Sequence, residues 1–115
     1  MTKTAEPVEL NPDTLASTMV DAAKGAFAEH WPEVARFADR EFRQLATRIL
    51  QIAGDVTEGL YDAPTGRMLI AMQRNVAAQA IAGLTTLTLL LVERAINRAL
   101  DALRELVGGV IRGLL

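Results

Sequence analysis

The chain has 115 residues, of which 50% are hydrophobic, 4% aromatic and 23% charged, and its formal net charge is −2 at pH 7. Alanine and leucine, with 19 and 16 residues, are the commonest types, and both are strong helix formers. This composition excludes collagen, disulfide-rich scaffolds and disordered tails. The absence of cysteine excludes thiol catalysis, zinc fingers and iron–sulfur clusters.

The charge balance does not favour nucleic-acid binding. The sequence pI is about 5.3, whereas nucleic-acid-binding domains commonly have a pI above about 9. Arg36, Arg40 and Arg43 share one predicted helix face, but Glu33 and Asp39 have the spacing of intrahelical partners for Arg36 and Arg43. We therefore expect a solvated face whose charges pair with one another. The first residues lack the apolar core of a secretory signal peptide, so the default localisation is cytoplasmic.

The order of predicted elements is an N-terminal arm followed by one helical domain. Residues 1–10 are polar and show no apolar periodicity. Residues 11–115 form the domain, in which apolar side chains recur at helical spacing without an alternating strand pattern. Proline and glycine divide it into three predicted helices, over about residues 12–29, 32–61 and 65–107.

Local signals place both ends of the first helix. Asn11 is a favoured N-cap, Pro12 suits the first helical position, and Asp13 complements the positive end of the helix dipole. At the other end, Trp31 precedes Pro32, and a proline disfavours helical backbone in the residue before it. We therefore expect Trp31 to be extended and the chain to turn there.

The second helix carries a regular apolar seam. Its apolar positions alternate between spacings of four and three residues, as at the a and d positions of a coiled coil: Ala38, Phe42, Leu45, Ile49, Ile52 and Val56. The loop over residues 61–66 that follows contains a proline and a glycine and is short. The third helix should therefore run antiparallel to the second.

The third helix is predicted to be the longest. Between residues 67 and 107 there is no proline and one glycine, Gly83, so we expect one continuous helix roughly 60 Å long. One apolar seam runs as far as Leu90 and another begins at Val92, shifted by about two residues in phase. Such a shift indicates a change of supercoil or of packing partner. The glycine-rich residues 108–115 are expected to leave the regular helix.

The segment from Asn75 to Val92 carries no formal charge. Its apolar side chains do not keep to one face, which is typical of a helix that is buried on all sides or lies in a membrane. Extended back to Met68, the segment contains a single charge, Arg74, and is long enough to span a bilayer. Its polar side chains and the lack of flanking Trp or Tyr argue against a span.

Three interpretations of this segment stay open, of which the last is a peripheral amphipathic contact. In the first, the segment is the centre of a helical bundle. The two shorter helices cannot cover it on every side, so other copies or other proteins complete its burial. In the second, residues 68–92 span a membrane.

Few residues are candidates for catalysis. His30 is the only histidine, and it lies with Glu29 and Glu33 beside the turn after the first helix. Di-iron sites in helical bundles need Glu-x-x-His pairs, whereas here the order is reversed and occurs once, so we expect a turn histidine packed near Trp31. Ser17 is the only serine, and no phosphate-binding loop occurs. We predict no enzymatic activity, no cofactor and no metal.

These patterns predict an all-α fold, in which a short N-terminal helix precedes a long antiparallel helical hairpin with coiled-coil-like seams, assembled as an oligomeric bundle. The predicted function is that of a non-enzymatic structural or assembly protein. Its long apolar helix self-associates or docks in a larger multi-protein complex, for example a bacterial or phage assembly such as a virion. The alternative is a small membrane-inserted or channel-forming protein with residues 68–92 as the span. The predicted interface residues are Phe42, Leu45, Ile49, Ile52, Val56, Val76, Leu84, Leu87, Leu90, Leu91, Ile96 and Leu103.

Overall fold

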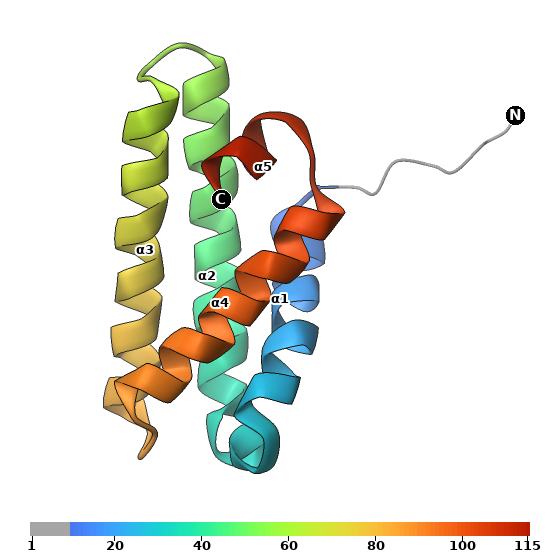
Figure 1. Cartoon of the computed structure of the whole chain (residues 1–115), viewed down its shortest axis with the longest axis vertical. Helices are drawn as coiled ribbons and strands as arrows, with labels where there is room; N and C mark the ends of the chain where they lie inside the picture. The colour runs from blue at the N-terminus through green and yellow to red at the C-terminus, as the bar shows by residue number, and fades with distance from the viewer. Residues whose placement is uncertain (1–9) are drawn as a thin grey trace, which may run out of the picture.

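The computed structural model describes residues 10–115, and all regular structure within them is helical (Figure 1). The prediction of an all-α fold is therefore confirmed for this part of the chain. Except for Leu10, the predicted polar arm lies outside the described residues. The elements are α1 (Pro12–Phe27), a 3-10 turn (Ala28–His30), α2 (Trp31–Thr57), α3 (Ala63–Leu84), α4 (Leu89–Leu106) and α5 (Gly109–Leu114).

Three helices lie side by side and a fourth crosses them (Figure 1). α1, α2 and α3 form one layer, with α2 in the middle and packed on both neighbours. α4 crosses this layer diagonally, packs mainly on α1, and diverges from α3 along its length. α5 lies against α2 and α3, toward the end at which these two helices are joined.

The core lies between the layer and α4. Short helices have only a weak intrinsic preference for the helical state. Burying a large aliphatic or aromatic side chain stabilises the fold by roughly 1.5–3 kcal/mol, so packing in the core is what stabilises these helices. The largest fully buried side chains come from all four long helices: Leu15, Met19, Phe27, Val34, Phe42, Ile49, Ile81, Val92, Ile96, Leu100 and Leu103.

α1 begins as the sequence predicts. The Thr14 amide donates a hydrogen bond of 2.9 Å to Asn11 Oδ1, which caps the helix, and Pro12 and Asp13 occupy the first turn. Asp13 also forms an ion pair with Arg43, which fastens the start of α1 to the middle of α2.

The turn between α1 and α2 differs from the prediction at Trp31. Trp31 has helical backbone angles, φ −54° and ψ −44°, and begins α2, with Pro32 in its first turn. The chain instead changes direction at Ala28, whose φ is +52° and ψ −122°. Proline is tolerated in the first turn of a helix. The Trp31 ring also packs beside Phe27, with 6.1 Å between ring centroids, and this packing favours the helical position.

The prediction of one helix over residues 65–107 is wrong, because the chain breaks at residues 85–88 into α3 and α4. Thr85 has extended backbone, and its hydroxyl donates a hydrogen bond of 2.9 Å to the Ile81 carbonyl. Thr88 is the N-cap of α4 and accepts a hydrogen bond of 3.2 Å from the Leu91 amide. Threonine side chains can compete with the helical backbone in this way, so the break needs neither proline nor glycine. The phase shift of the apolar pattern lies between Leu90 and Val92, in the first turn of α4 just after the break, and α4 packs on α1.

The same break divides the segment predicted to span a membrane. Residues 68–92 belong to two helices and a connector rather than to one helix. Among residues 10–115, no helix combines the length and the apolar character that a bilayer crossing requires. The single helix over residues 68–92 on which the membrane-span alternative depends is therefore not formed.

The C-terminal segment folds back onto α2 and α3. The chain leaves the helix after α4, as expected, and turns through Gly109, whose φ is +57°. α5 then places Leu114 against Gly66 in the first turn of α3. A Cβ atom at Gly66 would lie 2.8 Å from Val56 Cγ2 and 2.9 Å from Leu114 Cδ2. The absence of a side chain at Gly66 therefore lets α2, α3 and α5 approach one another closely.

Replacing Gly66 by alanine should lower the free energy of unfolding by about 1–3 kcal/mol, because the stiff Val56 side chain and Leu114 must move to admit the methyl group. Gly83→Ala is the matched control. Gly83 lies in the same helix, and nothing lies within 4 Å of a Cβ added there. Its replacement by alanine should therefore stabilise the protein by about 0.5–1 kcal/mol. Urea denaturation of both variants measures the difference. Equal effects of the two substitutions would contradict close packing at Gly66.

Replacing Ala28 by glycine should raise the free energy of unfolding by about 1 kcal/mol. The backbone angles of Ala28 are those of the first central residue of a type II′ turn, which glycine adopts without a steric penalty. Ala35→Gly, within α2, should instead destabilise by about 1 kcal/mol, since its backbone is helical. Thermal unfolding followed by circular dichroism should show opposite shifts in midpoint. A loss of stability in Ala28→Gly would contradict the strained turn.

Candidate interaction surface

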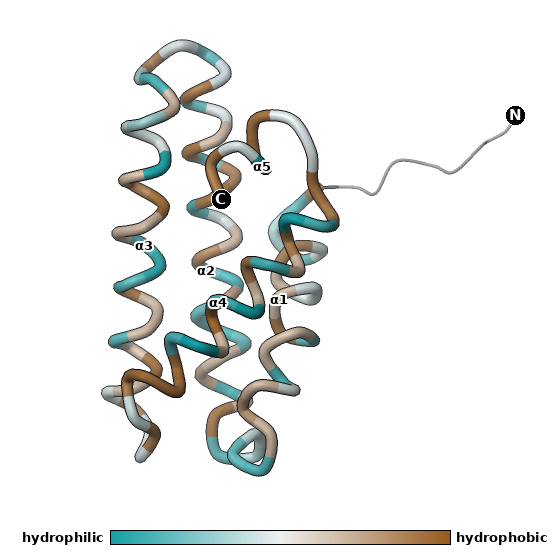
Figure 2. The backbone as a smooth tube through the Cα atoms, in the orientation of Figure 1, coloured by the Kyte–Doolittle hydropathy of each residue, from teal (hydrophilic) through white to brown (hydrophobic). Residues whose placement is uncertain are grey.

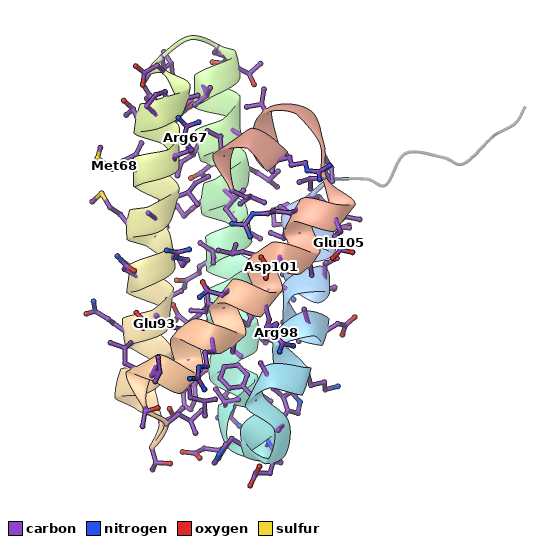
Figure 3. All side chains as sticks on the ribbon, in the orientation of Figure 1. Arg67, Met68, Glu93, Arg98, Asp101 and Glu105 are labelled. Atoms are coloured by element: carbon purple, nitrogen blue, oxygen red, sulfur yellow. The ribbon has the colours of Figure 1, made fainter. Side chains whose placement is uncertain are left out.

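α3 carries apolar side chains on two opposite sides. The inner side packs in the core and includes Ile70, Ala77 and Ile81, all buried. The outer side includes Met68, which points away from the rest of the molecule in Figure 3, and Val76, whose side chain is 59% exposed. A surface helix usually has one apolar stripe and an opposite polar face, so a second apolar side requires an explanation.

We define the α3 face as the exposed residues on the outer side of this helix, with Asn75 at its border toward α4: Met68, Met72, Asn75, Val76, Gln79 and Gly83. Three members are large apolar residues spaced four apart, and the others are uncharged. The only charged residues of α3 are Arg67 and Arg74, which lie on the edge that faces α4 and α5. The α3 face therefore presents an uncharged surface along most of the helix.

A second group of exposed apolar residues lies where α3 ends and α4 begins. Leu84, Leu89 and Leu90 are 50%, 43% and 59% exposed. Figure 2 shows the apolar start of α4 beside the C-terminal end of α3. We call this group the leucine corner. It extends the exposed apolar surface beyond the end of the α3 face.

The twelve predicted interface residues fall into three groups. Val76, Leu84 and Leu90 are exposed, and Val56 and Leu91 are half-buried. The remaining residues are buried in the chain's own core, where no partner can reach them: Phe42, Leu45, Ile49, Ile52, Leu87, Ile96 and Leu103. The structure therefore brings only part of the predicted set to the surface.

The sequence pattern does not identify Met68, Met72 and Leu89 as surface residues, because it predicts a long helix that is buried or embedded on all sides. The spacing of Met68, Met72 and Val76 is the signal that could have separated the two sides of α3, because residues four apart lie on the same side of a helix.

Glu33 anchors the connector between α3 and α4. Its Oε2 atom accepts hydrogen bonds from the Thr86 amide at 2.8 Å and from the Thr86 hydroxyl at 2.7 Å. These bonds, chiefly the one from the amide, lower the pKa of the Glu33 carboxyl below its ordinary value of 4.5, with a smaller contribution from His30. Glu33 thereby ties the connector to the first turn of α2.

This contact also changes the pairing expected on the outer face of α2. Arg43 lies 3.7 Å from Asp39, which is the intrahelical pair that the sequence predicts. The predicted pair of Glu33 with Arg36 does not form, because Glu33 is engaged by Thr86. The charges on this face are thus only partly neutralised by one another.

The group formed by Glu29, His30 and Glu33 shows no arrangement for metal binding. His30 is exposed at the end of the 3-10 turn, and the carboxylate of Glu33 faces Thr86. In the part of the chain that the structure describes, no three His, Cys, Asp or Glu side chains are placed to hold a metal ion.

Comparison of the chain with protein-family models, curated proteins and solved structures gives no match. Functional inference therefore depends on the side chains of the chain itself. Among them, the α3 face is the most extended exposed apolar surface on any one helix of the described residues.

The hydrogen bonds to Glu33 predict a pH-dependent contribution to stability. Because the folded-state pKa is lowered, this contribution is fully present above about pH 4.5 and is lost as pH falls through the lower, folded-state pKa. Glu33→Gln removes the charge that accepts these hydrogen bonds. The stability difference between wild type and Glu33→Gln should be constant near neutral pH and should shrink below pH 4.5. Urea denaturation between about pH 3 and 7 measures it. A difference that does not change over this range would contradict the contact.

Proposed function

We propose that this protein is a non-enzymatic assembly protein, and that its α3 face binds the α3 face of a second copy. The observation that carries the proposal is an exposed helix side that is apolar at every fourth position from Met68 to Val76 and free of charge up to Gly83. Apolar surface of this extent costs free energy when it is hydrated, and association removes it from water.

The sequence of the α3 face suits an antiparallel pair of helices related by a two-fold axis. In such a pair, residues whose numbers have a constant sum lie opposite each other. With the axis between Asn75 and Val76, the long Met68 side chain faces Gly83, where nothing lies within 4 Å of an added Cβ. Met72 then faces Gln79. A large side chain thus meets a small one at each end of the contact.

The charge distribution supports a second copy as the occupant. Two identical faces that carry no charge can approach each other without repulsion between like charges. Asn75 and Gln79 can donate and accept hydrogen bonds across the contact. A strongly acidic or basic partner, in contrast, would find no opposite charge on this face.

The size of the face sets the expected strength. From Met68 to Gly83 it is about 22 Å long and about 10 Å wide, which is less than the roughly 800 Å² that each partner buries in a standard interface. The leucine corner adds to this area only in part. We therefore expect a reversible dimer with a dissociation constant on the order of 10–100 µM.

Val76→Asp should weaken the dimer at least tenfold, because two carboxylates would be buried near the two-fold axis, each opposite Asn75 of the other copy, in place of two apolar side chains. Leu60→Asp is the matched control. Leu60 is 67% exposed but lies in the loop after α2, away from the α3 face, so its replacement should leave the dissociation constant unchanged. Sedimentation equilibrium measures both. A wild-type chain that stays monomeric up to about 500 µM, or equal weakening by both variants, would contradict the proposal.

Introduced cysteines test the antiparallel arrangement separately, since the native chain has no thiol. Val76→Cys lies beside the proposed axis and should form a disulfide-linked dimer on mild oxidation. Met68→Cys lies about 22 Å from its symmetry mate and should not, because a disulfide requires Cα atoms within about 7 Å. Efficient cross-linking at both positions would indicate parallel helices instead.

A further inference from the structure

A cavity of about 190 Å³ lies on the opposite edge of α3 from the α3 face. Arg67 and Arg74 border it from α3, and Ile70, Leu100 and Leu114 contribute apolar surface from α3, α4 and α5. We call it the arginine cavity. The residues that line the cavity belong to α3, α4 and α5 and to the C-terminal Leu115, and Figure 1 shows these three helices on the same side of α2.

Both arginines of the cavity lack a direct partner. Within residues 10–115, neither takes part in a hydrogen bond or an ion pair, whereas Arg43 and Arg104 both do. Arg67 acts only at longer range, on Asp62, whose pKa it helps to lower. Arg74 is half-buried. Arg67 is exposed. A guanidinium group that has no protein partner can bind a carboxylate or phosphate through two parallel hydrogen bonds.

The side chains around the cavity favour an anion as well. No acidic side chain lines it, and the Leu115 oxygen at its border accepts a hydrogen bond of 2.6 Å from Arg104. Glu93 borders a neighbouring cavity of about 240 Å³ on the other side of Arg74, together with Asn75 and Asn97. The two parts of the described chain also differ in charge. Residues 63–115 contain six arginines and three acids, whereas residues 10–62 contain nine acids and five basic residues. The arginine cavity lies on the basic part.

We propose that the arginine cavity binds a small anionic amphiphile. The headgroup, a carboxylate or a phosphate, would lie between Arg67 and Arg74, and a short hydrocarbon chain would cover Ile70, Leu100 and Leu114. At roughly 30 Å³ for each water-sized group, the cavity holds about six such groups, which fits a chain of medium length. A partner helix, about 10 Å across, is too wide for it.

Titration with octanoate, followed by NMR of the ¹⁵N-labelled full chain, tests this site. We expect saturable shifts of the Arg67 and Arg74 side-chain Nε–H signals and of the amides near Leu100 and Leu114. Octanamide has the same chain without the charge, and acetate has the charge without the chain. Each should bind at least tenfold more weakly than octanoate. Octanamide binding as tightly as octanoate would overturn the proposal, as would the absence of saturable shifts at millimolar concentrations.

The double variant Arg67→Gln/Arg74→Gln should weaken octanoate binding at least tenfold. Arg94→Gln/Arg98→Gln, which removes the same charge from α4 outside this cavity, should change the affinity less than twofold. Equal losses in both variants would show nonspecific charge attraction and overturn the site. Binding to phosphatidylglycerol vesicles without binding to free octanoate would also overturn it, since it would indicate a membrane surface as the ligand.

This inference does not rest on the proposed dimer, because the α3 face and the arginine cavity occupy different sides of α3. Val76→Asp should weaken self-association at least tenfold without changing the affinity for octanoate. Arg67→Gln/Arg74→Gln should weaken octanoate binding without changing the dissociation constant of the dimer. The two proposals can therefore fail independently.

Discussion

The way this chain buries its most apolar segment depends on the connector between α3 and α4. As one straight helix, residues 68–92 would present apolar side chains around their whole circumference, and two short helices could not cover them. Three threonines in the connector and the carboxylate of Glu33 hold a bend instead. The bend directs α4 back across α1, where Val92, Ile96 and Leu103 are fully buried. A small set of hydrogen bonds, one of them long-range in sequence, thus makes a compact fold possible for a single copy.

The bend leaves α3 at the edge of the helical layer, with α2 on one side and no neighbour on the other (Figure 1). An edge helix needs only one apolar side to join the core, and Ile70 and Ile81 supply it. The apolar side chains of Met68, Met72 and Val76 are therefore not required for the fold of one copy. Their retention on the exposed side is the physical basis for proposing a contact with a second copy.

The divergence of α4 from α3 has a second consequence. Helices that cross at an angle leave a wedge, and α5 closes this wedge from the third side. The arginine edge of α3 faces the wedge, so two guanidinium groups lie beside apolar surface without direct partners. One helix thus carries three kinds of surface: a core side, an uncharged outer side and a cationic edge. Each offers a different chemistry to its surroundings.

Several features of this protein follow from the amino-acid sequence alone. The helical class, the cap at Asn11 and the buried seam from Ala38 to Ile52 are local or periodic properties that neighbouring residues determine.

The site was predicted only in part. Val76, Leu84 and Leu90 lie at the surface, but most of the predicted interface lies in the core, because hydrophobicity does not distinguish a side chain covered by its own chain from one left exposed. Only the tertiary structure decided that the last long helix breaks at Thr85, because Glu33, which holds the connector through Thr86, is more than fifty residues away in sequence. Periodicity reports which residues avoid water, whereas the path of the chain determines what covers them.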